Sequence, residues 1–242
     1  FRKELDNKGR SESNYSKYDL KTLEQTRKIH RKEPVSGSKA QNAVFFLHGY
    51  GADGADLFDL SKPFSMVMPN AAFISPDAPY DCAMSPIGKE WFPIEKIPSG
   101  AFEASKDFLK FLENECKSLS ISLEQIVLIG FSQGAMMSLQ TLLISPKKFA
   151  AIIAFSGGLS SENLQMSEDF LEDGKHKNCK TPILLVHGEQ DDVVPFSSLK
   201  ITEDLLSNIG FNVEKLSRPG LGHGIDPDGI SAGMNFLKQI NF

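Results

Sequence analysis

Short apolar segments recur along the chain from Ala43 onward and indicate buried strands. Each has about five residues, is rich in Val, Ile, Leu or Phe, and does not alternate with polar residues. Strands covered on both faces of a parallel sheet have this pattern, because neither face meets water. The segments are Ala43–Leu47, Ala71–Ser75, Ile126–Gly130, Ala151–Phe155 and Ile183–His187.

Helical periodicity lies between these apolar segments. In Gly100–Lys117 apolar residues recur at steps of three and four, and Gln133–Ile144 forms a second such segment. A third, Ser197–Ile209, is followed by Gly210, a residue type that commonly ends helices. Alternating strands and helices predict an α/β fold with a doubly wound, mostly parallel sheet flanked by helices.

The first 40 residues differ from the rest of the chain. Residues 1–33 hold ten Lys or Arg and six Asp or Glu, a net charge of +4, and contain few large apolar residues. We therefore predict a polar N-terminal extension or edge strand over residues 1–40 and one α/β domain over residues 41–242. Since the whole chain carries −5, the part after residue 33 carries −9.

The composition argues against several classes of protein. Hydrophobic residues make up 40% of the 242 residues, which is too many for a disordered chain. A negative net charge gives no overall attraction to nucleic acid, and no apolar run approaches the roughly 20 residues of a transmembrane segment. Cys82, Cys116 and Cys179 cannot all pair, which indicates either a reducing compartment or incidental buried thiols, and we expect a cytoplasmic location. Because the sequence begins at Phe1, removal of a signal peptide is left open.

Ser132 lies in the pattern G-x-S-x-G, between an apolar strand and a helical segment. The pattern alone is weak, but a strand before it and a helix after it are typical of a nucleophile elbow. Such a turn strains the serine backbone and presents Oγ above the sheet. Gly130 and Gly134 would avoid collisions with the neighbouring strand and helix. The alternative is an ordinary turn whose serine caps the helix.

A serine nucleophile needs a base, and the base needs an orienting acid. His223 is flanked by glycines on a predicted loop and is the favoured base, whereas His48 and His187 each end a strand and are expected to shape turns. The acidic residues that follow Ile183–His187 lie at the carboxyl edge of the sheet, where α/β folds bind ligands. The spacing of His and Cys residues indicates no metal site.

The glycine-bearing turn after Ala43–Leu47 is the fourth element of the predicted site. Acyl transfer develops negative charge on a carbonyl oxygen, which two backbone N–H groups can stabilise. In this architecture one donor follows the nucleophile, here Gln133, and the other comes from the early turn, for which we choose Tyr50. A phosphate-binding loop is disfavoured, because acids follow the glycines and the P-loop lysine is absent.

Together, these motifs resemble the carboxylesterase/phospholipase family of serine α/β-hydrolases, which includes acyl-protein thioesterases and lysophospholipases. The resemblance runs from about Ala43 to the end of the chain and rests on five segments. These are Leu47–Asp53, Gly130–Ala135, Ala154–Gly157, His187–Pro195 and Gly222–His223.

The resemblance implies that Ser132 is the nucleophile, His223 the base and Asp191 the orienting acid. It also implies that the backbone N–H groups of Tyr50 and Gln133 form the oxyanion hole.

One position departs from the family. Pro often follows the catalytic Asp there, whereas this chain has Asp192. The spacing from His187-Gly188 and to Val193-Val194-Pro195 favours Asp191 over Asp192 as the acid.

The aromatic pair Trp91-Phe92 falls where the family has such a pair in a loop near the substrate. With Ile94 it is expected to bind an acyl chain, because apolar side chains suit such a ligand better than a sugar or phosphate.

The implied function is a serine carboxylesterase that hydrolyses short- to medium-chain carboxylic esters without a cofactor or metal. The alternative is an acyl-protein thioesterase or lysophospholipase, because the same catalytic groups serve all three. A non-catalytic binding module on the same scaffold is less favoured, although fold alone never implies activity. The expected partner is a small-molecule or lipid ester, and the sequence leaves a homodimer open.

Overall fold

The computed structural model describes residues 27–171 and 180–240, and its centre is a seven-stranded sheet. The strand order is β1-β3-β2-β6-β7-β8-β9, and all neighbours run parallel except the edge strand β1, which is antiparallel to β3. This confirms the mostly parallel sheet predicted from the sequence. The strands are β1 (Ile29–Lys32), β2 (Asn42–Leu47), β3 (Ala71–Pro76), β6 (Ile126–Phe131), β7 (Ala151–Phe155), β8 (Ile183–Gly188) and β9 (Val213–Arg218).

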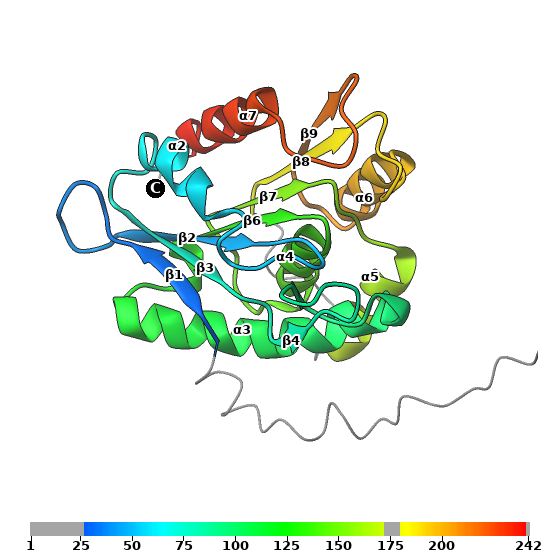
Figure 1. Cartoon of the computed structure of the whole chain (residues 1–242), viewed down its shortest axis with the longest axis horizontal. Helices are drawn as coiled ribbons and strands as arrows, with labels where there is room; N and C mark the ends of the chain where they lie inside the picture. Colours follow the sequence, from blue (N-terminus) through cyan, green and yellow to red (C-terminus); the bar gives the residue numbers. More distant parts are fainter. Residues whose placement is uncertain (1–26, 172–179, 241–242) are drawn as a thin grey trace, which may run out of the picture.

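Helices cover both faces of the sheet, as Figure 1 shows. Two of them, α2 and α7, pack on one face, and α3, α4, α5 and α6 pack on the other. This is the doubly wound arrangement that the alternation of strands and helices predicts. The helices are α2 (Ser61–Ser65), α3 (Ser99–Leu119), α4 (Gln133–Ile144), α5 (Ser161–Phe170), α6 (Ser197–Asn208) and α7 (Pro227–Lys238).

Neighbouring residues of the central strands contribute to two separate hydrophobic clusters. In β2, Phe45 belongs to the cluster that includes α3 and α4, whereas Phe46 belongs to the cluster that includes α2 and α7. Successive side chains of a strand point to opposite faces, so a strand covered on both faces must be apolar throughout. All six residues of β2 are buried, which explains why its sequence does not alternate.

The proline-rich stretch over residues 76–99 packs against the turn that follows β2. It contains the short antiparallel strands β4 (Tyr80–Asp81) and β5 (Lys89–Glu90). The Lys89 N–H donates to the Ala52 carbonyl oxygen at 2.7 Å, and the Gly51 N–H donates to the Lys89 carbonyl oxygen at 2.9 Å. The stretch therefore braces the turn in which Tyr50 lies.

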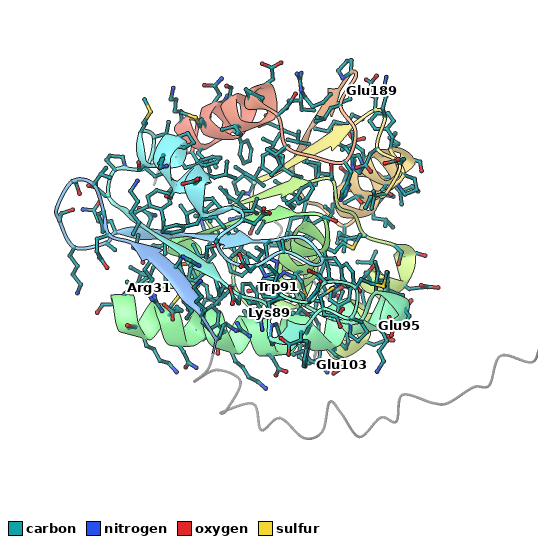
Figure 2. The ribbon with its side chains drawn as sticks, in the orientation of Figure 1. Arg31, Lys89, Trp91, Glu95, Glu103 and Glu189 are labelled. Atoms are coloured by element: carbon teal, nitrogen blue, oxygen red, sulfur yellow. The ribbon has the colours of Figure 1, made fainter. Side chains whose placement is uncertain are left out.

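The edge strand β1 lies within residues 1–40, for which we predicted an extension or edge strand. It pairs with β3, and Figure 2 shows Arg31 on this strand, above α3. Both terminal nitrogens of Arg31 donate to the carboxylate of Glu115 in α3 at 2.7 Å. These contacts attach β1 to the sheet and to the helix layer. Residues 1–26 lie outside the described residues, so the domain boundary at residue 40 stays a prediction.

The structure describes two of the three cysteines. Cys82 and Cys116 are buried free thiols, and Cys179 lies outside the described residues. Within the described ranges, none of the helices is long and apolar enough to cross a membrane.

Candidate active site

Ser132 lies at the sharp turn between β6 and α4, at the carboxyl edge of the sheet. Its φ of 54° and ψ of −117° fall in a region that residues with a side chain rarely adopt. The Ser132 N–H donates to the Phe155 carbonyl oxygen at 2.9 Å, which holds the turn against β7. The strained turn predicted from the sequence is therefore present in the structure.

Gly130 and Gly134 allow this turn to approach its neighbours closely. A Cβ at Gly130 would lie 2.3 Å from the Gly134 carbonyl oxygen, and a Cβ at Gly134 would lie 2.0 Å from the Leu47 carbonyl oxygen in β2. Both distances are far inside van der Waals contact. The structure thus confirms the collisions with helix and strand that we expected from larger residues at these positions.

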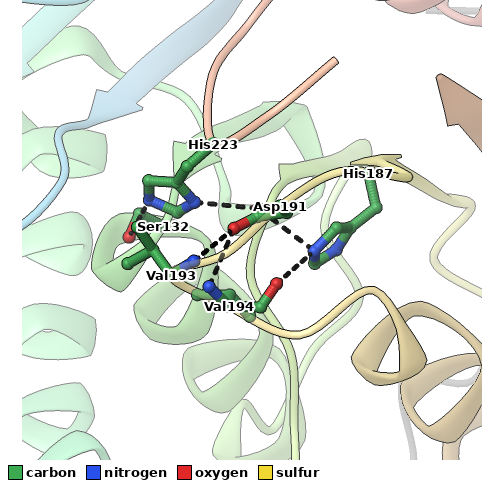
Figure 3. Close-up of polar contacts among 6 residues, drawn as sticks. All are labelled: Ser132, His187, Asp191, Val193, Val194 and His223. Atoms are coloured by element: carbon green, nitrogen blue, oxygen red, sulfur yellow. Dashed lines mark hydrogen bonds and ion pairs between the residues drawn. The ribbon is translucent and has the colours of Figure 1, made fainter. Parts of the chain in front are cut away.

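His223 joins Ser132 to Asp191 through two hydrogen bonds (Figure 3). His223 Nε2 lies 3.0 Å from Ser132 Oγ, and His223 Nδ1 lies 2.8 Å from Asp191 Oδ2. Because Nδ1 faces a carboxylate it carries the ring proton, and Nε2 then accepts the hydroxyl hydrogen of Ser132. The structure brings together three residues that are distant in the sequence and that we predicted to act together.

The Asp191 carboxylate is buried and held by the backbone of its own loop. Its Oδ1 accepts hydrogen bonds from the N–H groups of Val193 at 3.0 Å and Val194 at 2.8 Å. Burial acts to raise the pKa of Asp191, but the hydrogen bonds from His223, Val194 and Val193 outweigh it, so the pKa lies below its ordinary value. Asp191 is therefore a carboxylate at neutral pH. The alternative acid, Asp192, is exposed to solvent.

His187 is a second imidazole beside Asp191, and the sequence reasoning did not assign it to the site. Its Nε2 lies 2.9 Å from the Val194 carbonyl oxygen and 3.2 Å from Asp191 Oδ2 (Figure 3). Both partners are acceptors, so Nε2 carries the ring proton. The hydrogen bond to Val194 also closes the turn that we expected His187 to shape. A lone polar residue at the end of a fully apolar strand was the signal for this position.

The backbone N–H groups of Tyr50 and Gln133 lie on neighbouring segments beside Ser132. A Cβ at Gly49 would lie 3.5 Å from Ser132 Cβ, so the turn after β2 runs next to the serine. Among the residues that the structure describes, neither the Tyr50 nor the Gln133 N–H donates to an acceptor. Two backbone donors at this edge of the sheet are thus available to a ligand.

The side chains of Trp91 and Phe92, which we expected to bind an acyl chain together with Ile94, lie in the hydrophobic core. Each is 1% exposed, whereas Ile94 is 51% exposed. The Trp91 indole N–H donates to the His48 carbonyl oxygen at 2.9 Å, and its ring packs edge-on against Phe108 of α3. These partners are distant in the sequence, so the motif alone could not give the side-chain direction. Substrate contact by Trp91, Phe92 and Ile94 stays a prediction.

A pocket of about 580 Å³ lies between the proline-rich stretch and α3. Trp91 and Phe92 line it together with charged side chains of α3. The hydrogen-bonded array of Ser132, Asp191 and His223 contributes no lining residue. The pocket is therefore separate from the array. In the described part of the chain, no group of three or more His, Cys, Asp or Glu residues is arranged to hold a metal ion.

The fold and this array together define a class of protein. A mostly parallel sheet, a strained serine after a central strand, and an acid and a histidine on later loops are the features of serine hydrolases with the α/β-hydrolase fold. The chain order of Ser132, Asp191 and His223 is also the order found in that fold.

The chain belongs to the phospholipase/carboxylesterase family, whose model matches residues 34–241. It is 30% identical over 226 residues to an acyl-protein thioesterase 1 from Candida albicans, which covers 86% of this chain and 95% of that protein. It is 31% identical over 220 residues to a probable carboxylesterase from Oryza sativa subsp. japonica, with 85% and 81% covered. Among solved structures, esterase PE8 has a TM-score of 0.79 at 34% identity and covers 89% of this chain and 99% of its own. The family that the motifs resembled is confirmed, and the protein is a serine hydrolase.

Proposed function

We propose that this protein is a serine carboxylesterase that hydrolyses short- to medium-chain carboxylic esters through an acyl-enzyme on Ser132. The observation that carries the proposal is the hydrogen-bonded array of Ser132, His223 and Asp191 at the carboxyl edge of the sheet. The family supports it, because named relatives include carboxylesterases. The proposed chemistry uses groups of this chain and water alone.

In the first step, Ser132 Oγ forms a bond to the ester carbonyl carbon while His223 Nε2 takes the hydroxyl proton. The electron pair of the carbonyl bond moves to its oxygen, and the N–H groups of Tyr50 and Gln133 stabilise this oxyanion. The protonated His223 then gives its proton to the leaving alcohol oxygen as the ester C–O bond breaks. An acyl group remains on Ser132.

In the second step, water attacks the acyl carbon and His223 takes a proton from it. The tetrahedral oxyanion uses the same two N–H donors. His223 then returns the proton to Ser132 Oγ as the bond between Oγ and the acyl carbon breaks. The carboxylic acid leaves, and the serine is restored.

Asp191 orients the base in both steps. Its carboxylate lies 2.8 Å from His223 Nδ1, so it fixes the tautomer that leaves Nε2 free to accept a proton. It also stabilises the imidazolium that forms when Nε2 is protonated. The carboxylate does not itself take up the proton.

An acyl-protein thioesterase or a lysophospholipase is the alternative. The same nucleophile, base and oxyanion donors attack a thioester or a lysophospholipid ester. The observation that favours this alternative is the similarity to the thioesterase from Candida albicans. Rates for an oxygen ester and a thioester with the same acyl chain, followed by a series of chain lengths, would distinguish the substrate classes.

The substrate is proposed to be a small-molecule or lipid ester whose acyl chain contacts Trp91, Phe92 and Ile94. The exposed apolar side chain of Ile94 supports this, and Trp91 and Phe92 line a pocket, although both are largely buried. A homodimer and a cytoplasmic location stay predictions, which size-exclusion chromatography with light scattering and localisation of the tagged protein would test.

Hydrolysis of p-nitrophenyl esters by the wild type and by Ser132→Ala tests the proposal. Loss of the nucleophile should lower kcat by about 10³-fold or more. Ser231→Ala on the outer surface of α7 is the matched control and should keep wild-type activity, because Ser231 is exposed and its Oγ donates to the Pro227 carbonyl oxygen within the same helix. Equal rates in the wild type and Ser132→Ala would reject the mechanism.

A fluorophosphonate probe separates an enzyme from a binding module on the same scaffold. An activated serine forms a bond to phosphorus and displaces fluoride, so the wild type should be labelled at Ser132 and Ser132→Ala should not. An unlabelled wild type would favour the binding module.

A further inference from the structure

Buried side chains connect the two segments that carry the proposed oxyanion donors. Gln133 Oε1 accepts a hydrogen bond from the Trp91 N–H at 2.8 Å, and Gln133 Nε2 donates to the Phe92 carbonyl oxygen at 2.7 Å. The Trp91 indole N–H in turn donates to the His48 carbonyl oxygen at 2.9 Å. The start of α4 is thereby linked through Trp91 to the turn after β2.

The His48 side chain fixes the peptide unit that contains the Tyr50 N–H. His48 Nε2 accepts a hydrogen bond from the Ala78 N–H at 2.9 Å, so Nδ1 carries the ring proton and donates to the Gly49 carbonyl oxygen at 2.8 Å. In a trans peptide the carbonyl oxygen and the following N–H point in opposite directions. Holding the Gly49 oxygen on His48 therefore sets the direction of the Tyr50 N–H.

The network is almost completely removed from solvent. Gln133 is 3% exposed, Trp91 and Phe92 are each 1% exposed, and His48 is 0% exposed. Polar groups at such depth are costly unless they are hydrogen-bonded, and bonded groups at low dielectric are held firmly. Each polar side-chain atom of His48, Trp91 and Gln133 has a partner in the bonds described above. These groups are therefore fixed before a substrate arrives.

We propose that the side chains of His48, Trp91 and Gln133 are positioning residues that hold the Tyr50 and Gln133 N–H donors at a fixed spacing and direction for the oxyanion. The inference rests on the proposed function. It assigns Trp91 a role through its hydrogen bonds, in addition to any contact with an acyl chain. Donors that are already aimed need no reorganisation as charge develops, so their alignment affects the transition state more than the bound substrate.

The test uses Gln133→Met, which keeps the backbone N–H and similar side-chain bulk but removes both hydrogen bonds of the side chain. Complete loss of one oxyanion donor costs about 10²- to 10³-fold in kcat, so misalignment should cost about 10-fold with little change in KM. The affinity of a trifluoromethyl ketone should weaken by a similar factor, because Ser132 adds to it to form an oxyanion in the same site.

Gln140→Met is the matched control. Gln140 also lies in α4, is 0% exposed, donates to Ser167 Oγ at 2.8 Å and accepts from Asn163 Nδ2 at 2.7 Å. The substitution removes two buried side-chain hydrogen bonds of a glutamine in the same helix. Their partners, Ser167 and Asn163, are not part of the network of His48, Trp91 and Gln133. Gln140→Met should lose stability like Gln133→Met while keeping kcat and inhibitor affinity near wild type.

Trp91→Phe provides a second test that keeps an aromatic ring in the core. It removes the indole N–H bond to the His48 carbonyl oxygen and should also lower kcat and inhibitor affinity more than it changes KM. The double variant with Gln133→Met should lose less than the product of the two single losses, since both act on one network. If Gln133→Met does not fold, Trp91→Phe alone decides the outcome.

The inference is overturned if Gln133→Met loses no more kcat than Gln140→Met. It is also overturned if Trp91→Phe keeps wild-type kcat and inhibitor affinity. The same holds if the variants raise KM while kcat stays near the wild-type value. Failure of the proposed function looks different, because the wild type itself would then lack Ser132-dependent hydrolysis and fluorophosphonate labelling. An active, labelled wild type with unaffected variants rejects only the positioning role.

Discussion

Four N–H groups surround the Asp191 carboxylate within 3.2 Å: the rings of His223 and His187 and the backbone of Val193 and Val194. Asp191→Asn preserves the shape of the side chain but removes its charge and presents an amide that favours the wrong tautomer of His223. We expect kcat for p-nitrophenyl butyrate to fall by about 10³- to 10⁴-fold. Steady-state kinetics of the purified variant would measure the loss.

Asp192→Asn is the control for this substitution, because the neighbouring carboxylate is exposed. Its kcat should stay close to the wild-type value. A comparable loss in both variants would mean that removal of charge from this loop, and not the bond to His223, explains the effect.

The His187 ring contacts two buried acceptors beside the catalytic groups. His187→Leu removes the donor to the Val194 carbonyl oxygen and the contact with Asp191 Oδ2, so two buried acceptors lose a partner. Urea denaturation should show a lower free energy of unfolding by about 1–3 kcal/mol, and kcat should fall as Asp191 becomes less fixed. His187→Gln retains an N–H donor and should recover part of both losses. If the Gln and Leu variants behave alike, the hydrogen bonds of His187 are not the cause.

The sequence could identify the residues of the array better than the residues that support it. The elbow around Ser132 is a local pattern that the sequence alone can show. His223 lies between glycines on a predicted loop, where a catalytic role is more expected than a structural one. The supporting contacts of His187 and Gln133 join partners that only the folded chain brings together. Trp91 shows the same limit, because its hydrogen bonds join it to segments that are distant in the sequence.

At the scale of elements, the fully buried strands were the most predictable. The segments predicted around β2, β3, β6, β7 and β8 match the observed strands to within about one residue at each end. The edge strands were harder, because β9 (Val213–Arg218) is only partly buried and includes charged residues. We missed α7, although Asp226 caps its first turn by accepting from the Gly229 N–H and Pro227 begins the helix.

Gly134→Ala tests the contact between two elements, α4 and β2. The added methyl group would lie 2.0 Å from the Leu47 carbonyl oxygen, so the helix start must move away from the strand. We expect the free energy of unfolding to fall by about 3 kcal/mol in urea denaturation, with loss of hydrolysis because Ser132 and Gln133 move with the helix. Gly224→Ala is the control for stability, because its added Cβ meets no atom within 4 Å. Similar destabilisation of both variants would contradict this packing argument.

At the scale of the whole molecule, the topology explains why residues from distant parts of the chain meet. Parallel strands end at one edge of the sheet, so the loops after β2, β6 and β8 lie together there. Tyr50, Ser132 and Asp191 each follow one of these strands within a few residues. The predicted strands and their order along the chain were therefore enough to predict which edge of the sheet holds the site. They were not enough to predict where His48 and Trp91 lie within the core.

The buried His48 makes the stability of the whole molecule depend on pH. Burial lowers the pKa of His48 and the bond to the Gly49 carbonyl oxygen opposes this only in part, so the folded protein favours the neutral ring. A second ring proton would face the Ala78 N–H, which already donates to Nε2. The unfolded chain takes up this proton near pH ~6.5, so stability is fully present above that value and falls as the pH drops towards the lower folded-state pKa. Urea denaturation at about pH 7.5 and about pH 5.5 should therefore show a larger loss for the wild type than for His48→Gln, which has no titrating ring. Equal losses in the two proteins would show that other groups cause the pH dependence.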